Sequence, residues 1–129
     1  MQDLITPLAR VRGIGSGKHG AASWIALRVS GIALVPLGIW FVYSIVLLAG
    51  SPRSTVAYWF TSPFHTLGVV LLLGATFHHL YLGMKEVVED YVHCSVGKPA
   101  LLIFIKLASL AGFALGALSA ITLHLGAPL

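Results

Sequence analysis

Three long apolar stretches constrain the fold more than any other feature of this sequence. They run from about Ser23 to Ala49, from about Pro63 to Tyr91 and from about Pro99 to Gly126. A spanning helix needs roughly 20 mainly apolar residues to cross a hydrocarbon core about 30 Å thick, so each stretch is long enough. None alternates apolar and polar residues as the strands of a membrane barrel do. We therefore predict an all-α membrane protein with three transmembrane helices.

The composition agrees with a membrane protein and leaves room for one domain. Hydrophobic residues make up 57% of the 129 residues, charged residues make up 9%, and the mean hydropathy is +0.92. These values lie outside the range of ordinary soluble domains. The predicted membrane-anchor domain has an N-terminal segment 1–22, helices 23–49, 63–91 and 99–126, and connecting loops 50–62 and 92–98.

The positions of lysine and arginine predict the orientation. Arg10, Arg12 and Lys18 precede the first helix and Lys98 lies in the second loop, whereas the first loop has only Arg53. Cytoplasmic ends carry the excess of these residues, so the N-terminus is predicted to be cytoplasmic and the C-terminus periplasmic. The first apolar run is too long for a cleaved signal peptide and follows about 22 polar or mixed residues. The same topology explains the net charge of +4 without a nucleic-acid partner.

Two local features carry little function. The letters GSGKHG at residues 15–20 match G-x-G-x-x-G, but a dinucleotide-binding fingerprint needs a preceding strand and a βαβ unit. We interpret this segment as a flexible basic stretch beside the membrane. Cys94 is the single cysteine and has no partner for an internal disulfide.

The stretch HHLYLGMKEVVEDYVH, residues 78–93, places polar groups on an apolar helix. His79 shares one side of the helix with small residues and with the acidic end, and His78 points about 100° away. The members of this stripe are Gly68, Leu72, Ala75, His79, Gly83, Glu86 and Asp90. A flat, bulky ligand could lie along the stripe because Gly83 has no side chain to block it.

His79 is predicted to lie near mid-membrane, about 18 Å along the axis from Tyr91. Intramembrane ionisable residues are functional candidates by default, and a neutral imidazole among small apolar neighbours suits an axial haem ligand. The alternative is an interhelical hydrogen bond. No other histidine lies at that depth on a second helix, since His65 and His124 are near the outer ends and His19 and His93 are on the inner side. A partner subunit or a second copy must therefore supply the other ligand.

Polar residues at the inner end suggest quinone chemistry. Tyr91 offers a hydroxyl donor for a carbonyl, and Asp90 can exchange protons with the cytoplasm. The alternative is an ordinary interfacial helix end with an aromatic anchor. Arg28, about one turn inside the first helix, either snorkels to the headgroups or holds an anionic group such as a carboxylate.

Small residues recur every four positions in the third helix and form one stripe: Ala108, Gly112, Gly116 and Ala120. Such a stripe lets another backbone approach closely. It predicts packing either with helices of other subunits or within this chain.

Taken together, these residues resemble the smaller hydrophobic membrane-anchor subunit of bacterial succinate dehydrogenase (succinate:quinone oxidoreductase, complex II). The resemblance covers nearly the whole chain and rests on RVRGIGSGKHG, WIALRVSGIALVPLGIWFV and HLYLGMKEVVEDYVH. The last stretch matches the family pattern of His, three residues, Gly, six residues, Asp-Tyr. The N-terminal block is most similar to alphaproteobacterial forms. His78 departs from the family, in which that position is usually aromatic or apolar.

The resemblance implies a role for four residues. His79 occupies the axial position for a haem b whose opposite ligand comes from the other membrane-anchor subunit, so that the two anchors pack as a helical bundle around the haem. Arg28 matches an arginine near a haem propionate. Tyr91 matches the tyrosine that hydrogen-bonds ubiquinone, and Asp90 the acid beside it.

The resemblance also implies partners and a place in the cell. The chain would anchor a flavoprotein and an iron-sulfur subunit to the bacterial inner membrane, and electrons would pass from succinate to ubiquinone in the tricarboxylic acid cycle and respiratory chain. It would itself be a non-catalytic subunit, and one cysteine cannot hold a cluster that ordinarily needs four. The alternatives are a fumarate reductase anchor, another small cytochrome b, and a non-enzymatic assembly factor or transporter subunit with a proton-relay histidine.

Overall fold

The computed structural model describes residues 20–126, and within this range the chain is all-α. It contains α2 (Gly20–Leu48), α3 (Arg53–Phe60), α4 (Pro63–Tyr91) and α5 (Gly97–His124), with no strand among the described residues. Helices α2, α4 and α5 are long and apolar enough to cross a membrane. The predicted fold class is thus confirmed. The part of the predicted segment 1–22 that precedes residue 20, with the glycine-rich motif up to His19, lies outside the described residues.

The observed helix bounds lie close to the predicted ones, with one addition. The second span, 63–91, coincides with α4, whereas α2 begins three residues earlier than predicted and α5 two. Helix α3 occupies part of the segment 50–62, for which the sequence predicts a loop. Its eight residues, RSTVAYWF, include no acidic residue in the first turn, and no side chain caps its N-terminus, so the sequence lacks the usual signals of a helix start.

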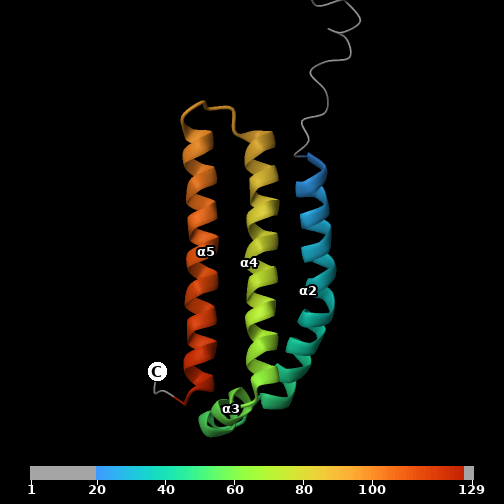
Figure 1. Cartoon of the computed structure of the whole chain (residues 1–129), viewed down its shortest axis with the longest axis vertical. Coiled ribbons are helices and arrows are strands. Elements are labelled where there is room, and N and C mark those ends of the chain that lie inside the picture. Colours follow the sequence, from blue (N-terminus) through green and yellow to red (C-terminus); the bar gives the residue numbers. More distant parts are fainter. Residues whose placement is uncertain (1–19, 127–129) are drawn as a thin grey trace, which may run out of the picture.

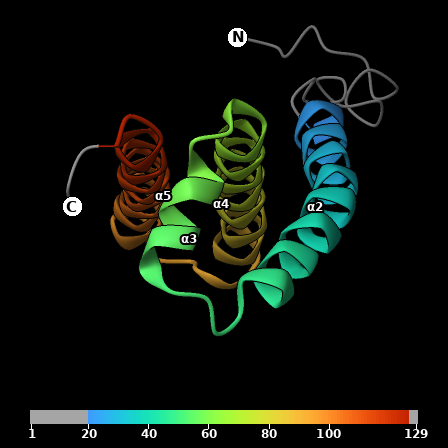
Figure 2. The same cartoon turned by 90° about the horizontal axis from the view of Figure 1, so that it is seen from below.

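Helix α4 lies between α2 and α5, so the three long helices form a row (Figures 1 and 2). It packs against both neighbours, and we call these contacts the α2–α4 seam and the α4–α5 seam. The end of the bundle where α4 finishes is the Tyr91 end, and the opposite end, which α3 crosses, is the α3 end (Figure 1). Because α4 is central, residues on its two sides face different surroundings.

Small residues permit close packing in the α4–α5 seam. A side chain at Gly112 would collide with the ring of Phe77, and a Cβ at Gly116 would lie 2.9 Å from Leu73 Cδ1. Ala120, in the same stripe, is buried. Three of the four small residues on α5 therefore pack within this chain, which is one of the two predicted alternatives.

Hydrogen bonds and ring stacking hold α3 against α4 and α5 at the α3 end. His65 Nδ1–H donates to Trp59 O over 2.8 Å, and the two rings stack with centroids 4.2 Å apart. His124 Nδ1–H donates to Phe60 O over 2.9 Å. These two histidines are thus used as donors to carbonyls of α3.

Most of the outer surface is apolar, as expected for helices solvated by lipid. No large side chain of the described residues is fully buried, and many leucine, isoleucine and valine side chains are exposed on all three long helices. Without water to supply hydrogen bonds, helices can span lipid because their backbone groups are paired internally. The chain thus has the surface of a membrane subunit with room for further protein neighbours.

Candidate functional site

His79 lies in the α2–α4 seam and contacts α2 directly. Its Nδ1 is 3.1 Å from the Oγ of Ser30, a buried residue. A Cβ built on the adjacent Gly31 would lie 3.4 Å from His79 Cε1. The imidazole is therefore held by a polar contact on one side and has little room to rotate toward α2.

The hydrogen bonds of Ser30 determine the tautomer of His79. The Ser30 hydroxyl also lies 3.0 Å from Leu27 O, a carbonyl that can only accept. A hydroxyl has a single hydrogen, and donating it to Leu27 leaves the oxygen to accept from the imidazole. Nδ1 of His79 then carries the proton, and Nε2 keeps a free lone pair. Metal-ligating histidines commonly donate their second ring nitrogen in this way.

The predicted stripe around His79 is open only on its Tyr91 side. Toward the α3 end, a Cβ at Gly68 would lie 2.5 Å from the Trp40 ring, so α2 already fills that part. At Gly83, one turn from His79 toward Tyr91, a Cβ would meet nothing within 4 Å. A flat ligand along the whole stripe is therefore excluded within this chain, and space for one begins at His79 and continues past Gly83.

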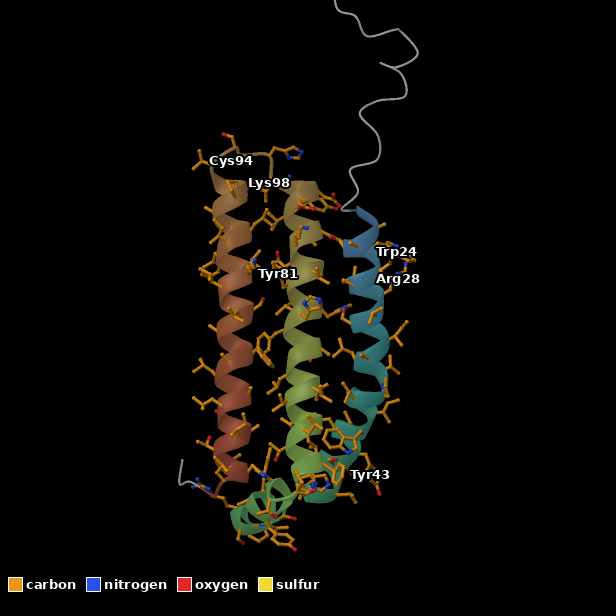
Figure 3. The ribbon with its side chains drawn as sticks, viewed as in Figure 1. Trp24, Arg28, Tyr43, Tyr81, Cys94 and Lys98 are labelled. Carbon is orange, nitrogen blue, oxygen red and sulfur yellow. The ribbon has the colours of Figure 1, made fainter. Side chains whose placement is uncertain are left out.

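His78 faces the other seam. It lines a groove of about 370 Å³ between α4 and α5 together with Tyr81 and Lys106. Figure 3 shows Tyr81 lying between α4 and α5. The remaining wall is mainly apolar and includes Gly74, Phe77 and Phe113. The two adjacent histidines thus contact different helices.

Tyr91 and Asp90 end α4 and are both open to the surroundings. The Tyr91 side chain is 79% exposed, and Asp90 is also exposed. Neither contacts His79, which lies about 18 Å away along the helix axis. These two residues can meet a ligand only where a further subunit or the membrane surface covers the Tyr91 end.

Arg28 lies on the outer side of α2. Its guanidinium is 4.9 Å from the centroid of the Trp24 ring, a cation–π distance, and both side chains point away from α4 (Figure 3). Positions 28 and 30 are about 200° apart on a helix, so Arg28 faces almost opposite to Ser30. The structure therefore does not bring Arg28 and His79 together.

Two residues of these seams have no predicted role from the sequence. Ser30 can be recognised only once α2 and α4 are placed side by side, because serine is common in membrane helices. Lys106 does leave a signal, since it is a charged residue inside an apolar stretch. Among the described residues, no three His, Cys, Asp or Glu side chains gather as a metal site.

Cys94 lies in the turn between α4 and α5, outside the spanning segments. Its Sγ accepts a hydrogen bond from the backbone N–H of Gly97 over 3.4 Å. Hydrogen bonds from Gly97 and Val96 lower the pKa of the exposed Cys94 thiol below its ordinary value. The Cys94 thiol therefore loses its proton more readily than an ordinary cysteine thiol.

Known proteins match nearly the whole chain. The protein named succinate dehydrogenase hydrophobic membrane anchor subunit in Rickettsia typhi is 27% identical over 105 residues, covering 81% of this chain and 84% of that protein. Its namesake in Rickettsia bellii is 26% identical over 108 residues, covering 84% and 86%. That of Rickettsia felis is 28% identical over 97 residues, covering 75% and 78%. The predicted alphaproteobacterial likeness is confirmed.

The family itself follows from a match over residues 2–122 to the family model described as succinate dehydrogenase/fumarate reductase transmembrane subunit. This range includes both seams and the complete His-to-Tyr pattern of α4. The chain belongs to the succinate dehydrogenase/fumarate reductase transmembrane subunit family.

Proposed function

We propose that this chain anchors a succinate dehydrogenase to the membrane and shares a haem b with a second membrane-anchor subunit. In this role it holds the flavoprotein and iron-sulfur subunits at the bilayer and contributes to the site where ubiquinone accepts electrons from succinate. The family description covers fumarate reductases as well. The names of the relatives favour succinate dehydrogenase.

The observation that carries the haem proposal is the contact between Ser30 and His79. A buried oxygen that accepts from Nδ1–H fixes the ring and leaves Nε2 as a neutral nitrogen donor. The open space beside Gly83 supports the fit of a flat macrocycle on the same side. A bound haem b would supply one-electron redox capacity next to the quinone site.

No second histidine among residues 20–126 lies in the α2–α4 seam, so we propose that a partner subunit supplies the other haem ligand. His78 faces the α4–α5 seam, and His65 and His124 donate to carbonyls of α3. None of these three side chains therefore lies on the open side of the α2–α4 seam beside Gly83. The second anchor subunit is the proposed source, and its helices would cover the open side of the α2–α4 seam beside Gly83.

Tyr91 and Asp90 are proposed to serve ubiquinone at the Tyr91 end. The exposed phenol of Tyr91 would donate a hydrogen bond to a quinone carbonyl, which holds the ring in place and stabilises charge that develops on its oxygen. The exposed carboxylate of Asp90 would deliver protons from the aqueous side. The iron-sulfur subunit would complete this site by covering the two residues.

Arg28 is proposed to neutralise a haem propionate. Its guanidinium has no carboxylate within ion-pair distance among residues 20–126, so its charge is free for an external anion. Because it faces away from α4, a propionate would meet it only beyond the edge of α2. Its stacking on Trp24 would hold the guanidinium at this position.

The proposed location is the bacterial inner membrane with the Tyr91 end in the cytoplasm. This orientation puts Lys85 and Lys98 on the cytoplasmic side, which carries the excess of positive residues, and Arg53, the first residue of α3, on the periplasmic side. It follows that the N-terminus is cytoplasmic and the C-terminus periplasmic. Succinate oxidation then takes place on the cytoplasmic face.

The proposal is tested on the complex purified through a tag on this chain. We expect one low-spin b-type haem per copy of the chain, seen in the reduced-minus-oxidised spectrum and quantified after extraction. We expect the low-temperature spin resonance signal of an iron with two imidazole ligands. A complex that assembles with succinate dehydrogenase activity but without haem would contradict the haem proposal while leaving the anchor role intact.

The quinone role has a separate test. Tyr91→Phe removes the hydroxyl donor and keeps the ring, so ubiquinone reduction should fall about tenfold or more, as is typical for loss of one donor to a developing charge, while succinate oxidation with a soluble dye is unchanged. Tyr58→Phe, an exposed tyrosine on α3, is the matched control and should leave both activities intact. Equal losses in both assays for Tyr91→Phe would indicate failed assembly and count against a quinone contact.

A further inference from the structure

The α4–α5 groove contains polar groups that the haem and quinone proposals do not use. His78, Tyr81 and Lys106 line it together. The large side chains beside Lys106 on α5, Phe104 and Leu107, are more than half exposed. A cation in such surroundings calls for an explanation, because uncompensated charge in hydrocarbon is costly.

The depth of this cluster matches a lipid headgroup boundary. Tyr81 follows the start of α4 by 18 residues and Lys106 precedes the end of α5 by 18 residues. Taking the α3 end as the outer edge of a hydrocarbon core about 30 Å thick, Tyr81 and Lys106 lie about 27 Å from that edge at 1.5 Å per residue. On the same scale His79 lies about 24 Å from it, nearer the Tyr91 end than the mid-membrane position that the sequence predicts. Lys85, the first charged residue of α4, follows one turn beyond Tyr81. Lys106 is therefore within side-chain reach of the phosphate level at the Tyr91 end.

No anion from the described part of this chain occupies the cluster. Within residues 20–126 the one ion pair joins Lys85 to Glu89, whose nearest nitrogen and oxygen are 3.7 Å apart, and no carboxylate lies within ion-pair distance of Lys106. The Tyr81 hydroxyl and the His78 ring add hydrogen-bonding groups beside the lysine. Such a set, a lysine with two further hydrogen-bonding side chains, is complementary to a monoanionic phosphodiester.

We propose that this groove binds an anionic phospholipid of the leaflet at the Tyr91 end. The phosphodiester lies against Lys106, Tyr81 and His78, and one acyl chain runs toward the α3 end along Phe77, Phe113 and Gly74. Basic pockets between membrane helices are known to accept such headgroups. The acyl chains of a phospholipid already hold its phosphate at the edge of the bilayer. A carboxylate from a protein partner would have to lose its hydration to reach the same depth.

The test compares variants of the whole complex, purified through a tag on this chain and washed free of loosely held lipid. The Lys106→Gln complex should retain about one phosphatidylglycerol molecule fewer per copy than the native complex. The native complex should melt at a higher temperature in phosphatidylglycerol than in phosphatidylcholine, and Lys106→Gln should lose at least half of this difference. Lys106→Arg keeps the charge and should behave as the native protein. Lys98→Gln is the control, because Lys98 Nζ donates to Glu89 O over 2.7 Å outside the groove, and it should also behave as native.

A second variant distinguishes the lipid from a small anion. Leu110→Trp fills the apolar part of the groove and leaves the cation in place, so it should displace phosphatidylglycerol as effectively as Lys106→Gln. Retention of the lipid in both variants would overturn the proposal. So would an equal stabilisation of native protein by inorganic phosphate, or release of the second anchor subunit from Lys106→Gln, which would identify the partner of Lys106 as a protein carboxylate.

Discussion

The two seams of α4 differ in what they offer to a ligand, although their histidines are neighbours in the sequence. In the α2–α4 seam, His79 is held by a buried serine, and the helix surface one turn away at Gly83 is open. In the α4–α5 seam, His78 is exposed and shares a groove with a lysine and a tyrosine. A fixed neutral donor suits iron, and a group beside a permanent cation suits an anion. The helix period alone separates these two chemistries.

The largest effect is expected from a substitution at Gly31, which would disrupt the packing of the α2–α4 seam and lower the haem content. A Cβ there is already within 3.4 Å of His79 Cε1, so the two methyl groups of Gly31→Val would push the ring from its place. Overpacking costs about 1–3 kcal/mol, and we expect haem occupancy to fall by about tenfold. Gly38→Val, on the same helix with nothing within 4 Å, is the control. Pyridine haemochrome assays measure the haem content of both complexes. Equal haem contents would contradict the close packing of Gly31 against His79.

The next largest effect is expected from a substitution at Gly112, which would disrupt the packing of the α4–α5 seam and lower the stability of the complex. Gly112→Ala places a methyl group against the ring of Phe77, and we expect the complex to lose about 1–3 kcal/mol of stability. Haem per assembled complex should be unchanged, because this seam does not contain His79. Gly38→Ala, on α2 with nothing within 4 Å of the added Cβ, should leave the melting temperature unchanged. A drop in haem greater than the drop in assembly would show that the seams are not independent.

A smaller change sharpens the assignment of Ser30. Ser30→Ala removes the acceptor of the Nδ1 proton, which makes the imidazole a weaker electron donor to iron. The haem should remain bound with roughly tenfold lower affinity, and its midpoint potential should move upward because ferric iron loses stabilisation. Ser119→Ala, an exposed serine of α5 bonded to Leu115 O, is the control. An unchanged potential in a redox titration would count against the hydrogen bond.

The smallest effect tests which side of the membrane the Tyr91 end faces. Backbone hydrogen bonds favour the Cys94 thiolate, so the pKa of the thiol is lowered and alkylation should be faster than for a free cysteine at the same pH. The rate should rise with pH and level off earlier than for the free amino acid. A membrane-impermeant maleimide should label inverted vesicles and spare sealed cells. Labelling of sealed cells would reverse the proposed orientation.

The hydrophobic pattern predicts much of this fold, and the period of the helix predicts that the two histidines diverge. It could not predict which neighbour each would meet, because that depends on α4 lying between α2 and α5. Trp40 illustrates the limit, since its ring fills the space above Gly68 that the stripe leaves open for a ligand. Ser30 became meaningful only across the seam, 49 positions away in the chain. The roles of His79, Arg28, Tyr91 and Asp90 stay predictions.

The account is tested most directly by the reduced-minus-oxidised absorption spectrum of the purified complex, recorded for native protein, His79→Ala and His78→Ala. We predict that the b-type bands disappear in His79→Ala, while His78→Ala retains them at native intensity and loses bound phosphatidylglycerol instead. Retention of the bands in His79→Ala with their loss in His78→Ala would contradict the account and transfer the iron to the α4–α5 seam.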